Sequence, residues 1–192
     1  MLEQAAESLT EAHKRGLIHR DIKPSNLFVG PMGTLDDFVK VLDFGLVKAL
    51  PHIDTDELKL THEGTTTGTP AFMAPEVALG KAEINVTSDI YALGCVGYWL
   101  LTGMLVFDGE TPMEIVVNHV KTPPIPRSQR SEFEIPACLD ETIVSCLAKN
   151  PADRPQAMDQ LAEMLNTCHL SEGWTQKNAA AWWNSHAPDS LS

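Results

Sequence analysis

The feature that most restricts the fold of this 192-residue chain is a run of 18 uncharged, mostly apolar residues from Ile90 to Phe107. A run of this length is at the threshold for a helix that spans a membrane. Asp89 and Asp108 flank the run, no Lys or Arg lies close to either end to set an orientation, and three glycines lie within it. We therefore predict a buried helix at the centre of the fold, over about residues 88–101, and no membrane span.

The overall composition is that of an acidic globular protein. The chain carries 26 Asp and Glu residues against 14 Lys and Arg, a formal net charge of −12, and 43% of its residues are hydrophobic. Proteins that bind nucleic acids need clustered positive charge for the phosphate backbone, so we expect no nucleic-acid partner. Glu3 and Glu7 lie near the N-terminus, where no apolar signal-peptide core is present, and we expect a cytoplasmic protein.

The chain has four cysteines, at positions that form no C-x-x-C pair and no zinc-binding cluster with histidine. Cys95 and Cys146 lie inside apolar helical patterns, where a free thiol behaves as a small apolar side chain. We therefore predict reduced thiols, without a disulfide or a metal site, for all four. The other two are Cys138 and Cys168.

Hydrophobic periodicity predicts an α+β fold that is mainly α, with one short β hairpin. An apolar stripe predicts a first helix over residues 2–15, which Gly16 would end. Two short strands, residues 27–29 and 38–42, are expected to pair across a connection that contains Gly, Pro and Asp. Residues 46–70 have weak periodicity and are expected to form a long functional segment. Further helices are expected over residues 88–101, 111–121, 139–147 and 155–165.

Three short motifs follow one another along the chain. They are His19-Arg20-Asp21-Ile22-Lys23-Pro24-Ser25-Asn26, which fits H-R-D-x-K-x-x-N, then Asp43-Phe44-Gly45, and then Ala74-Pro75-Glu76. The ordered set is far more specific than any one tripeptide. In these motifs the chain resembles the eukaryotic-type serine/threonine protein kinases, which are found also in bacteria. The resemblance covers residues 1–167, expected to form a kinase-like C-terminal lobe, and leaves residues 168–192 as a tryptophan-containing tail.

The resemblance implies a phosphoryl-transfer site that uses ATP and Mg²⁺. Asp21 would accept the proton of the attacking hydroxyl, and Lys23 would place its charge beside the γ-phosphate. Asn26 and Asp43 would ligate Mg²⁺, which prefers oxygen ligands and needs few protein groups when phosphates are bound. Phe28 would lie under the adenine. The acceptor would be a Ser or Thr hydroxyl of a protein substrate.

Other residues receive structural roles from the same resemblance. Glu76 would form a buried ion pair with Arg154, although a surface pair of little energetic value would look the same in sequence. Asp89 would hold the backbone of the catalytic loop, or act only as a helix N-cap. The remaining structural positions are His19 and Phe44, expected to stack on each other, and Gly45.

The long segment before Ala74 is where we expect substrate recognition and regulation. By the resemblance, Lys23 and Thr69 mark the serine/threonine rather than the tyrosine branch, with Thr69 in the substrate loop. Arg20, directly before Asp21, would be uncompensated until a phosphate arrives on this segment. The candidate phosphorylation sites are Thr61, Thr65, Thr66 and Thr67, among which the sequence does not choose.

The N-terminal β lobe of a kinase is expected to be absent from this chain. No G-x-G-x-x-G occurs in the 192 residues, and no strand lysine with a pairing helix glutamate. We therefore expect the isolated chain to be inactive and its N-lobe to be missing or separate. The alternative is a non-catalytic scaffold or substrate-docking module. Intact Asp21, Asn26 and Asp43 favour a kinase, because a scaffold has no physical need for Mg²⁺ ligands.

The C-terminal tail resembles no catalytic motif. Trp182 and Trp183 lie beside a run of three alanines. Because apolar aromatic side chains are normally buried, we prefer a short helix that docks on the rest of the chain to a site for another protein.

Overall fold

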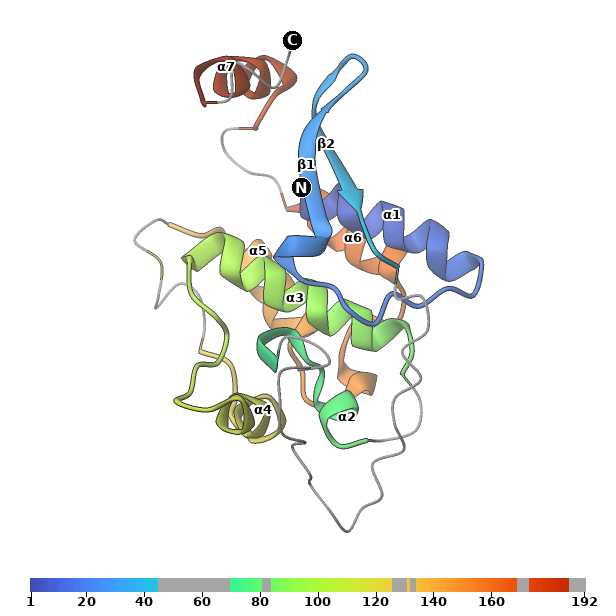
Figure 1. The fold of residues 1–192 in the computed structure, drawn as a ribbon, viewed down its shortest axis with the longest axis vertical. Coiled ribbons are helices and arrows are strands. Elements are labelled where there is room, and N and C mark those ends of the chain that lie inside the picture. The colour runs from blue at the N-terminus through green and yellow to red at the C-terminus, as the bar shows by residue number, and fades with distance from the viewer. Residues whose placement is uncertain (45–69, 81–83, 126–130, 132–133, 169–172, 187–192) are drawn as a thin grey trace.

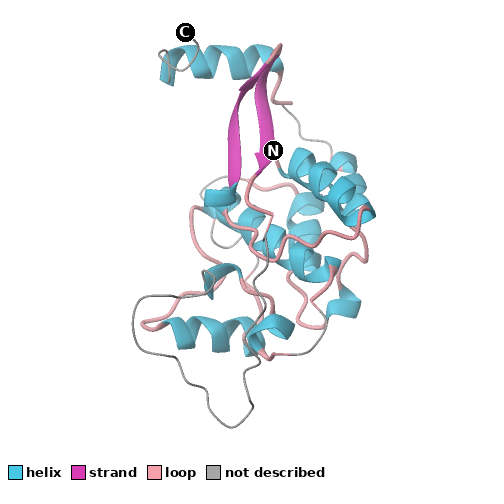
Figure 2. Cartoon of the chain, turned by 45° about the vertical axis from the view of Figure 1, so that its right-hand side comes forward, coloured by secondary structure: helices cyan, strands magenta, loops and turns pink. Residues whose placement is uncertain are grey.

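The computed structural model describes residues 1–44, 70–80, 84–125, 131, 134–168 and 173–186. Within these residues the fold is mainly helical and has a single two-stranded antiparallel sheet. The sheet projects as a hairpin from a body of helices, and the last helix lies beside its outer end (Figures 1 and 2). The predicted α+β class, mainly α, is confirmed for this part of the chain.

Helix α3 (Val86–Thr102) is the centre of the fold, as predicted. Every residue from Thr87 to Tyr98 is buried. A Cβ atom at Gly94 would lie 2.6 Å from the Cβ of Cys146 in α5 (Ala137–Cys146), so glycine is what permits these helices to pack this closely. Among the described residues, no helix combines the length and apolar character that crossing a membrane requires.

Helix α1 (Leu2–Lys14) packs its apolar stripe on α6 (Met158–Thr167) and on α3. The stripe is buried, which is the amphipathic pattern that the sequence predicted. Helix α6 begins three residues later than predicted, because Ala157 still has an extended backbone and serves as the N-cap. The buried stripe of α1 consists of Ala5, Ala6, Leu9 and Ala12.

The hairpin is longer than the sequence predicted. Strand β1 spans Leu27–Met32 and β2 spans Leu35–Val41, and Leu27 pairs with Val41. The expected connection is therefore mostly strand, and the turn is reduced to Gly33, at φ 61°, and Thr34. The predicted strand ended before Pro31, whereas β1 continues through it. Proline is tolerated there because a two-stranded sheet has only edge strands, where a missing N–H costs little.

Helix α4 (Pro112–Lys121) lies where a helix was predicted and starts with a proline after the N-cap Thr111. The Thr111 hydroxyl accepts from the Glu114 amide at 3.1 Å. The Glu114 carboxylate accepts from the Glu110 amide at 2.9 Å instead of closing a capping box on Thr111. The remaining described elements are the 3-10 turns η1 (Pro24–Asn26), η2 (Pro70–Phe72) and η4 (Pro151–Asp153) and the helices α2 (Pro75–Ala78) and α7 (Gln176–His186).

The prediction of four reduced thiols is wrong for two of them. Cys138 and Cys168 form a disulfide, with Cα atoms 5.6 Å apart, that joins the start of α5 to the residue after α6. The two cysteines are 30 residues apart in sequence, and only the packing of α5 on α6 brings them together. Cys95 and Cys146 are reduced, buried thiols, as predicted.

Candidate active site

The loop that carries the first motif is held by one buried carboxylate at the start of α3. Asp89, 1% exposed, accepts from the His19 amide at 2.8 Å through Oδ2 and from the Arg20 amide at 2.9 Å through Oδ1. Its Oδ2 also lies 2.8 Å from Nε2 of His13 in α1. Arg20 has φ 68°, a strained value for a residue with a side chain. The two hydrogen bonds from the His19 and Arg20 amides to Asp89 hold the backbone in this conformation.

Three side chains of the loop converge beyond this anchor. The Nζ of Lys23 lies 2.8 Å from Oδ2 of Asp21. The Nδ2 of Asn26 donates to the backbone oxygen of Asp21 at 2.7 Å and to its Oδ2 at 3.3 Å. Asn26 is buried, while Asp21 and Lys23 are partly exposed, so the carboxylate remains accessible to a bound molecule.

Asp43 is brought beside this loop by the hairpin. The Leu42 amide donates to the Asn26 carbonyl at 2.8 Å, one step beyond the Leu27–Val41 pair. The Leu42 carbonyl lies 2.8 Å from Nε2 of His19. Asp43 is exposed and has φ 53°, a left-handed conformation that aspartate tolerates better than most residues. The next side chain, Phe44, packs its ring on that of His19, with centroids 4.8 Å apart.

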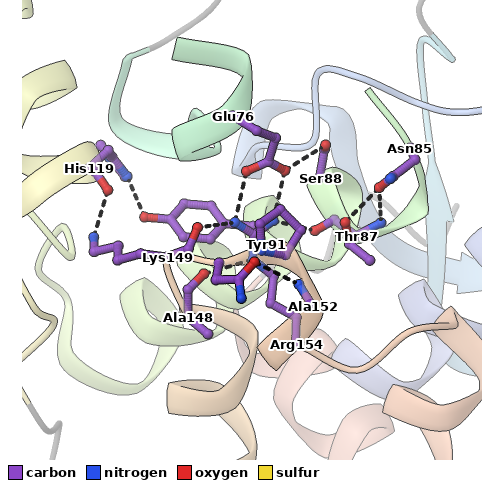
Figure 3. Close-up of polar contacts among 12 residues, drawn as sticks. Glu76, Asn85, Thr87, Ser88, Tyr91, His119, Ala148, Lys149, Ala152 and Arg154 are labelled. Atoms are coloured by element: carbon purple, nitrogen blue, oxygen red, sulfur yellow. Dashed lines mark hydrogen bonds and ion pairs between the residues drawn. The ribbon is translucent and has the colours of Figure 1, made fainter. Parts of the chain in front are cut away.

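The third motif ends in a buried ion pair. Nη1 and Nη2 of Arg154 donate to the two carboxylate oxygens of Glu76 at 2.7 and 2.8 Å (Figure 3). The Ser88 hydroxyl donates to the same carboxylate at 2.8 Å. Burial by itself would raise the pKa of Glu76, but these hydrogen bonds and the Arg154 charge outweigh it and hold that pKa below its usual value. A buried, bidentate pair excludes the alternative of a weak surface contact.

Comparison with known proteins shows the family. A family model described as protein kinase domain matches residues 1–165. The chain belongs to the protein kinase domain family. Its relatives include the serine/threonine-protein kinase pkn3 of Myxococcus xanthus, 39% identical over 160 residues. Another is the serine/threonine-protein kinase PknB of Mycobacterium leprae, 36% identical over 168 residues.

The matches cover most of this kinase domain but a small part of each relative. The pkn3 match spans 83% of the chain and 29% of the relative, and the PknB match spans 88% and 25%. The chain thus spans under a third of the length of these curated relatives. Activity, substrates and partners of the relatives are therefore matters of proposal for this kinase domain.

Two further predicted site residues of the kinase domain lie on its surface. Phe28, at the second position of β1, is 53% exposed, and a Cβ at Gly30 would lie 2.8 Å from its ring. The ring therefore rests on the hairpin backbone with one side free. Arg20 is exposed and forms no ion pair within the described residues.

The predicted regulatory and substrate-loop positions of the kinase domain lie outside the described residues, and their roles stay predictions. The same holds for the expected long segment over residues 46–70, apart from its last residue. The positions concerned are Gly45, Thr61, Thr65, Thr66, Thr67 and Thr69.

Sequence reasoning missed a buried polar group beside the ion pair. The Tyr91 hydroxyl lies 2.8 Å from Nδ1 of His119, and the His119 carbonyl accepts from Nζ of Lys149 at 2.7 Å (Figure 3). The available signal was the position of His119, four residues after Ile115 on one face of α4. A single histidine among apolar residues does not reveal its partners, because these come from α3 and from the segment between α5 and α6.

Proposed function

We propose that this kinase domain transfers the γ-phosphoryl group of ATP to Ser or Thr hydroxyls of protein substrates. The observation that carries the proposal is the convergence of Asp21, Lys23 and Asn26 on one loop with Asp43 held beside them. Phosphoryl transfer needs little covalent chemistry from the protein, and it relies on positioning and on neutralising negative charge. This group of residues supplies both.

Asp21 is the proposed acceptor for the proton of the substrate hydroxyl. Its Oδ2 is engaged by Lys23 and Asn26, whereas Oδ1 has no hydrogen-bond partner within the described residues. A hydroxyl that donates to Oδ1 would bind the same carboxylate as the Lys23 ammonium. Lys23 would then face both the carboxylate and the transferred phosphoryl group, and would offset the charge that this group carries.

The donor set fits Mg²⁺. The Nδ2 of Asn26 is committed to Asp21, which leaves its amide oxygen without a partner in the described part of the chain, and Asp43 offers an exposed carboxylate next to it. Two oxygen ligands suffice, because Mg²⁺ bound with nucleotide takes its other ligands from phosphates and water. Bound Mg²⁺ would neutralise phosphate charge. The residues that would hold it are Asn26 and Asp43.

Phe28 is the proposed contact for the adenine base. Its ring lies close to the backbone of Gly30 and is 53% exposed, so it offers apolar aromatic surface to a base. The relatives pkn3 and PknB are named serine/threonine-protein kinases. Together with Lys23, these names support Ser and Thr rather than Tyr as acceptors.

We infer that residues 1–192 form the C-terminal lobe and need a separate segment for turnover, since they contain no glycine-rich loop and no strand lysine. The decisive assay measures labelled γ-phosphate transfer to a Ser/Thr peptide library by residues 1–192 alone and by the same residues joined to such a segment. We expect transfer only from the joined protein.

The Asp21→Asn variant of the joined protein should lose at least about 100-fold in kcat, as expected for a general base. Asp159→Asn, an exposed aspartate on α6, is the matched control and should keep full activity. Equal turnover in the two variants would contradict the proposal. A joined protein that binds MgATP but transfers no phosphate would support the non-catalytic scaffold instead.

A further inference from the structure

The Glu76–Arg154 ion pair continues into a buried group that the proposed transfer step does not use. The Arg154 guanidinium lies over the Tyr91 ring, 4.8 Å from its centroid, and the Tyr91 hydroxyl pairs with His119 (Figure 3). Lys149 extends the group from the other side. These residues come from α2, α3, α4 and the segment between α5 and α6, so they connect elements that are far apart in sequence.

The imidazole of His119 is enclosed on all sides. Its residue is 0% exposed, and Phe107 meets the ring edge-on at a centroid distance of 4.9 Å. Burial and then the nearby Lys149 charge lower the pKa of His119 to about 4, while the backbone of Ala71 acts in the opposite direction. The ring is therefore neutral at physiological pH, and the turn η2, which contains Ala71, lies beside it.

The second ring nitrogen points to a specific contact. Nε2 of His119 has no hydrogen-bond partner at standard geometry within the described residues, although it is buried. If Tyr91 donates its hydroxyl proton to Nδ1, the neutral ring carries its own proton on Nε2. A buried N–H needs an acceptor. The turn η2 packs against α4, and the backbone of its residue Ala71 raises the pKa of His119.

Lys149 fixes the position of His119 along α4. Its Nζ donates to the carbonyls of His119 and Asn118, in the last turn of the helix, where a positive charge is favourable. The same Nζ lies 4.1 Å from the centroid of the Phe107 ring. Burial lowers the pKa of Lys149 to about 8, with the Arg154 charge acting in the same direction and Cys95 opposing it.

The segment from Pro70 to Ala78 is thereby held at both ends. Glu76, in α2, is fixed by Arg154, and η2, which contains Ala71, packs against α4, the helix that carries His119. Arg154 lies over the face of the Tyr91 ring, and His119 contacts the Tyr91 hydroxyl. Helix α4 also packs directly against η2 and α2. Tyr91 is therefore the common support of the two tethers.

We propose that His119 is a positioning residue that, through Tyr91 and the Ala71 backbone, sets the placement of residues 70–74. This rests on the proposed function and on the expectation from the sequence that Thr69 lies in the substrate loop, so that the segment directly after it receives the protein substrate. His119 does not touch the reacting atoms. It makes the substrate-receiving segment depend on the position of α4, so that peptide affinity and not the transfer step carries its effect.

The first test is hydrogen exchange on the 192-residue chain with His119→Phe, which keeps an aromatic ring and removes both nitrogens. The amides of Met73, Val77 and Ala78, bonded to Pro70 and Ala74, should exchange at least about tenfold faster, while those of α1 stay unchanged. His186→Phe, on the exposed face of α7, is the matched control. Unchanged exchange at Met73 and Val77 would overturn the proposal.

Two variants separate local placement from general loss of packing. Tyr91→Phe removes only the hydroxyl and should accelerate the same amides, and it decides the matter if His119→Phe does not fold. His119→Gln can still donate towards Ala71 and should restore part of the protection. If Tyr91→Phe leaves residues 70–78 as protected as in the parent chain, the proposal is wrong.

The second test uses the protein joined to its ATP-binding segment. His119→Phe should raise the KM for peptide about tenfold, with the KM for ATP and kcat nearly unchanged, because only ground-state peptide placement is affected. An equal effect on both KM values would contradict the role. Asp21→Asn should abolish transfer without changing exchange at Met73, so a failure of the proposed function leaves the exchange result standing.

Discussion

The Arg154 side chain uses its whole hydrogen-bonding capacity inside the protein. Its five N–H groups donate to both oxygens of Glu76 and to three backbone carbonyls, and the residue is 3% exposed. A guanidinium satisfied in this way can be buried at acceptable cost, whereas either partner alone cannot. The three carbonyls belong to Thr87, Ala148 and Lys149.

Removing Arg154 should therefore destabilise the protein strongly. We expect Arg154→Met to lower the free energy of unfolding by about 3–5 kcal/mol, because the Glu76 carboxylate remains buried without its counter-charge. Urea denaturation measures this. Lys14→Met, on an exposed side chain, should change stability by less than about 0.5 kcal/mol. A loss below about 1 kcal/mol for Arg154→Met would show that the pair contributes little.

At the scale of elements, the tail and the hairpin form one unit. Asp37 of β2 accepts from Nε1 of Trp183 at 2.7 Å and also from Nε1 of Trp174. The Asp36 amide donates to the Gln176 side chain at 2.8 Å, and Ala179 of α7 is fully buried. The predicted docking of a short tail helix is confirmed, although polar contacts of the indoles carry much of it and the Trp182 side chain stays largely exposed.

Asp37→Ala should release α7 from the hairpin, because two indole N–H groups lose their common acceptor. We expect the tryptophan emission maximum to move to longer wavelength and limited proteolysis to cut the tail several-fold faster. Asp36→Ala is the matched control, since Asp36 contacts Gln176 through its backbone amide and keeps that contact. Equal behaviour of the two variants would assign the docking to apolar packing alone.

At the scale of the whole molecule, acid should act on the fold through its buried groups. His119 has a folded-state pKa of about 4, below the ordinary value of 6.5. Between these two pH values its imidazole is protonated in the unfolded chain and neutral in the folded chain. Stability from this group is complete above pH 6.5 and falls as the pH drops towards 4. Glu76, with its lowered pKa, adds a second loss below pH 4.5.

Between pH 7 and pH 5 the His119 contribution should amount to about 2 kcal/mol of unfolding free energy. His119→Gln does not titrate and should flatten the stability profile over this interval, as measured by urea denaturation at each pH. The groups that face the ring, Lys149 and Tyr91, keep their charge states in this range. An unchanged slope in His119→Gln would mean that folding does not lower the pKa of His119.

Sequence patterns were sufficient for the elements whose neighbours are local. The α1 stripe, the buried α3 and the proline start of α4 follow from spacing along one helix, and the order of the three motifs was enough for the family. The extent of the hairpin was not predictable in this way, because the pairing of Met32 with Leu35 depends on the edge position of both strands.

The sequence alone determined which residues are candidates for chemistry: the residue types of Asp21, Lys23, Asn26 and Asp43 already specify a base, a cation and two oxygen ligands. Only the tertiary structure decided how distant residues meet. The Cys138–Cys168 disulfide, the His119–Tyr91 contact and the Asp37 site for the tail join residues 28 to 146 positions apart. Local periodicity reports which side of an element is buried, whereas the packing of elements determines which buried groups become partners.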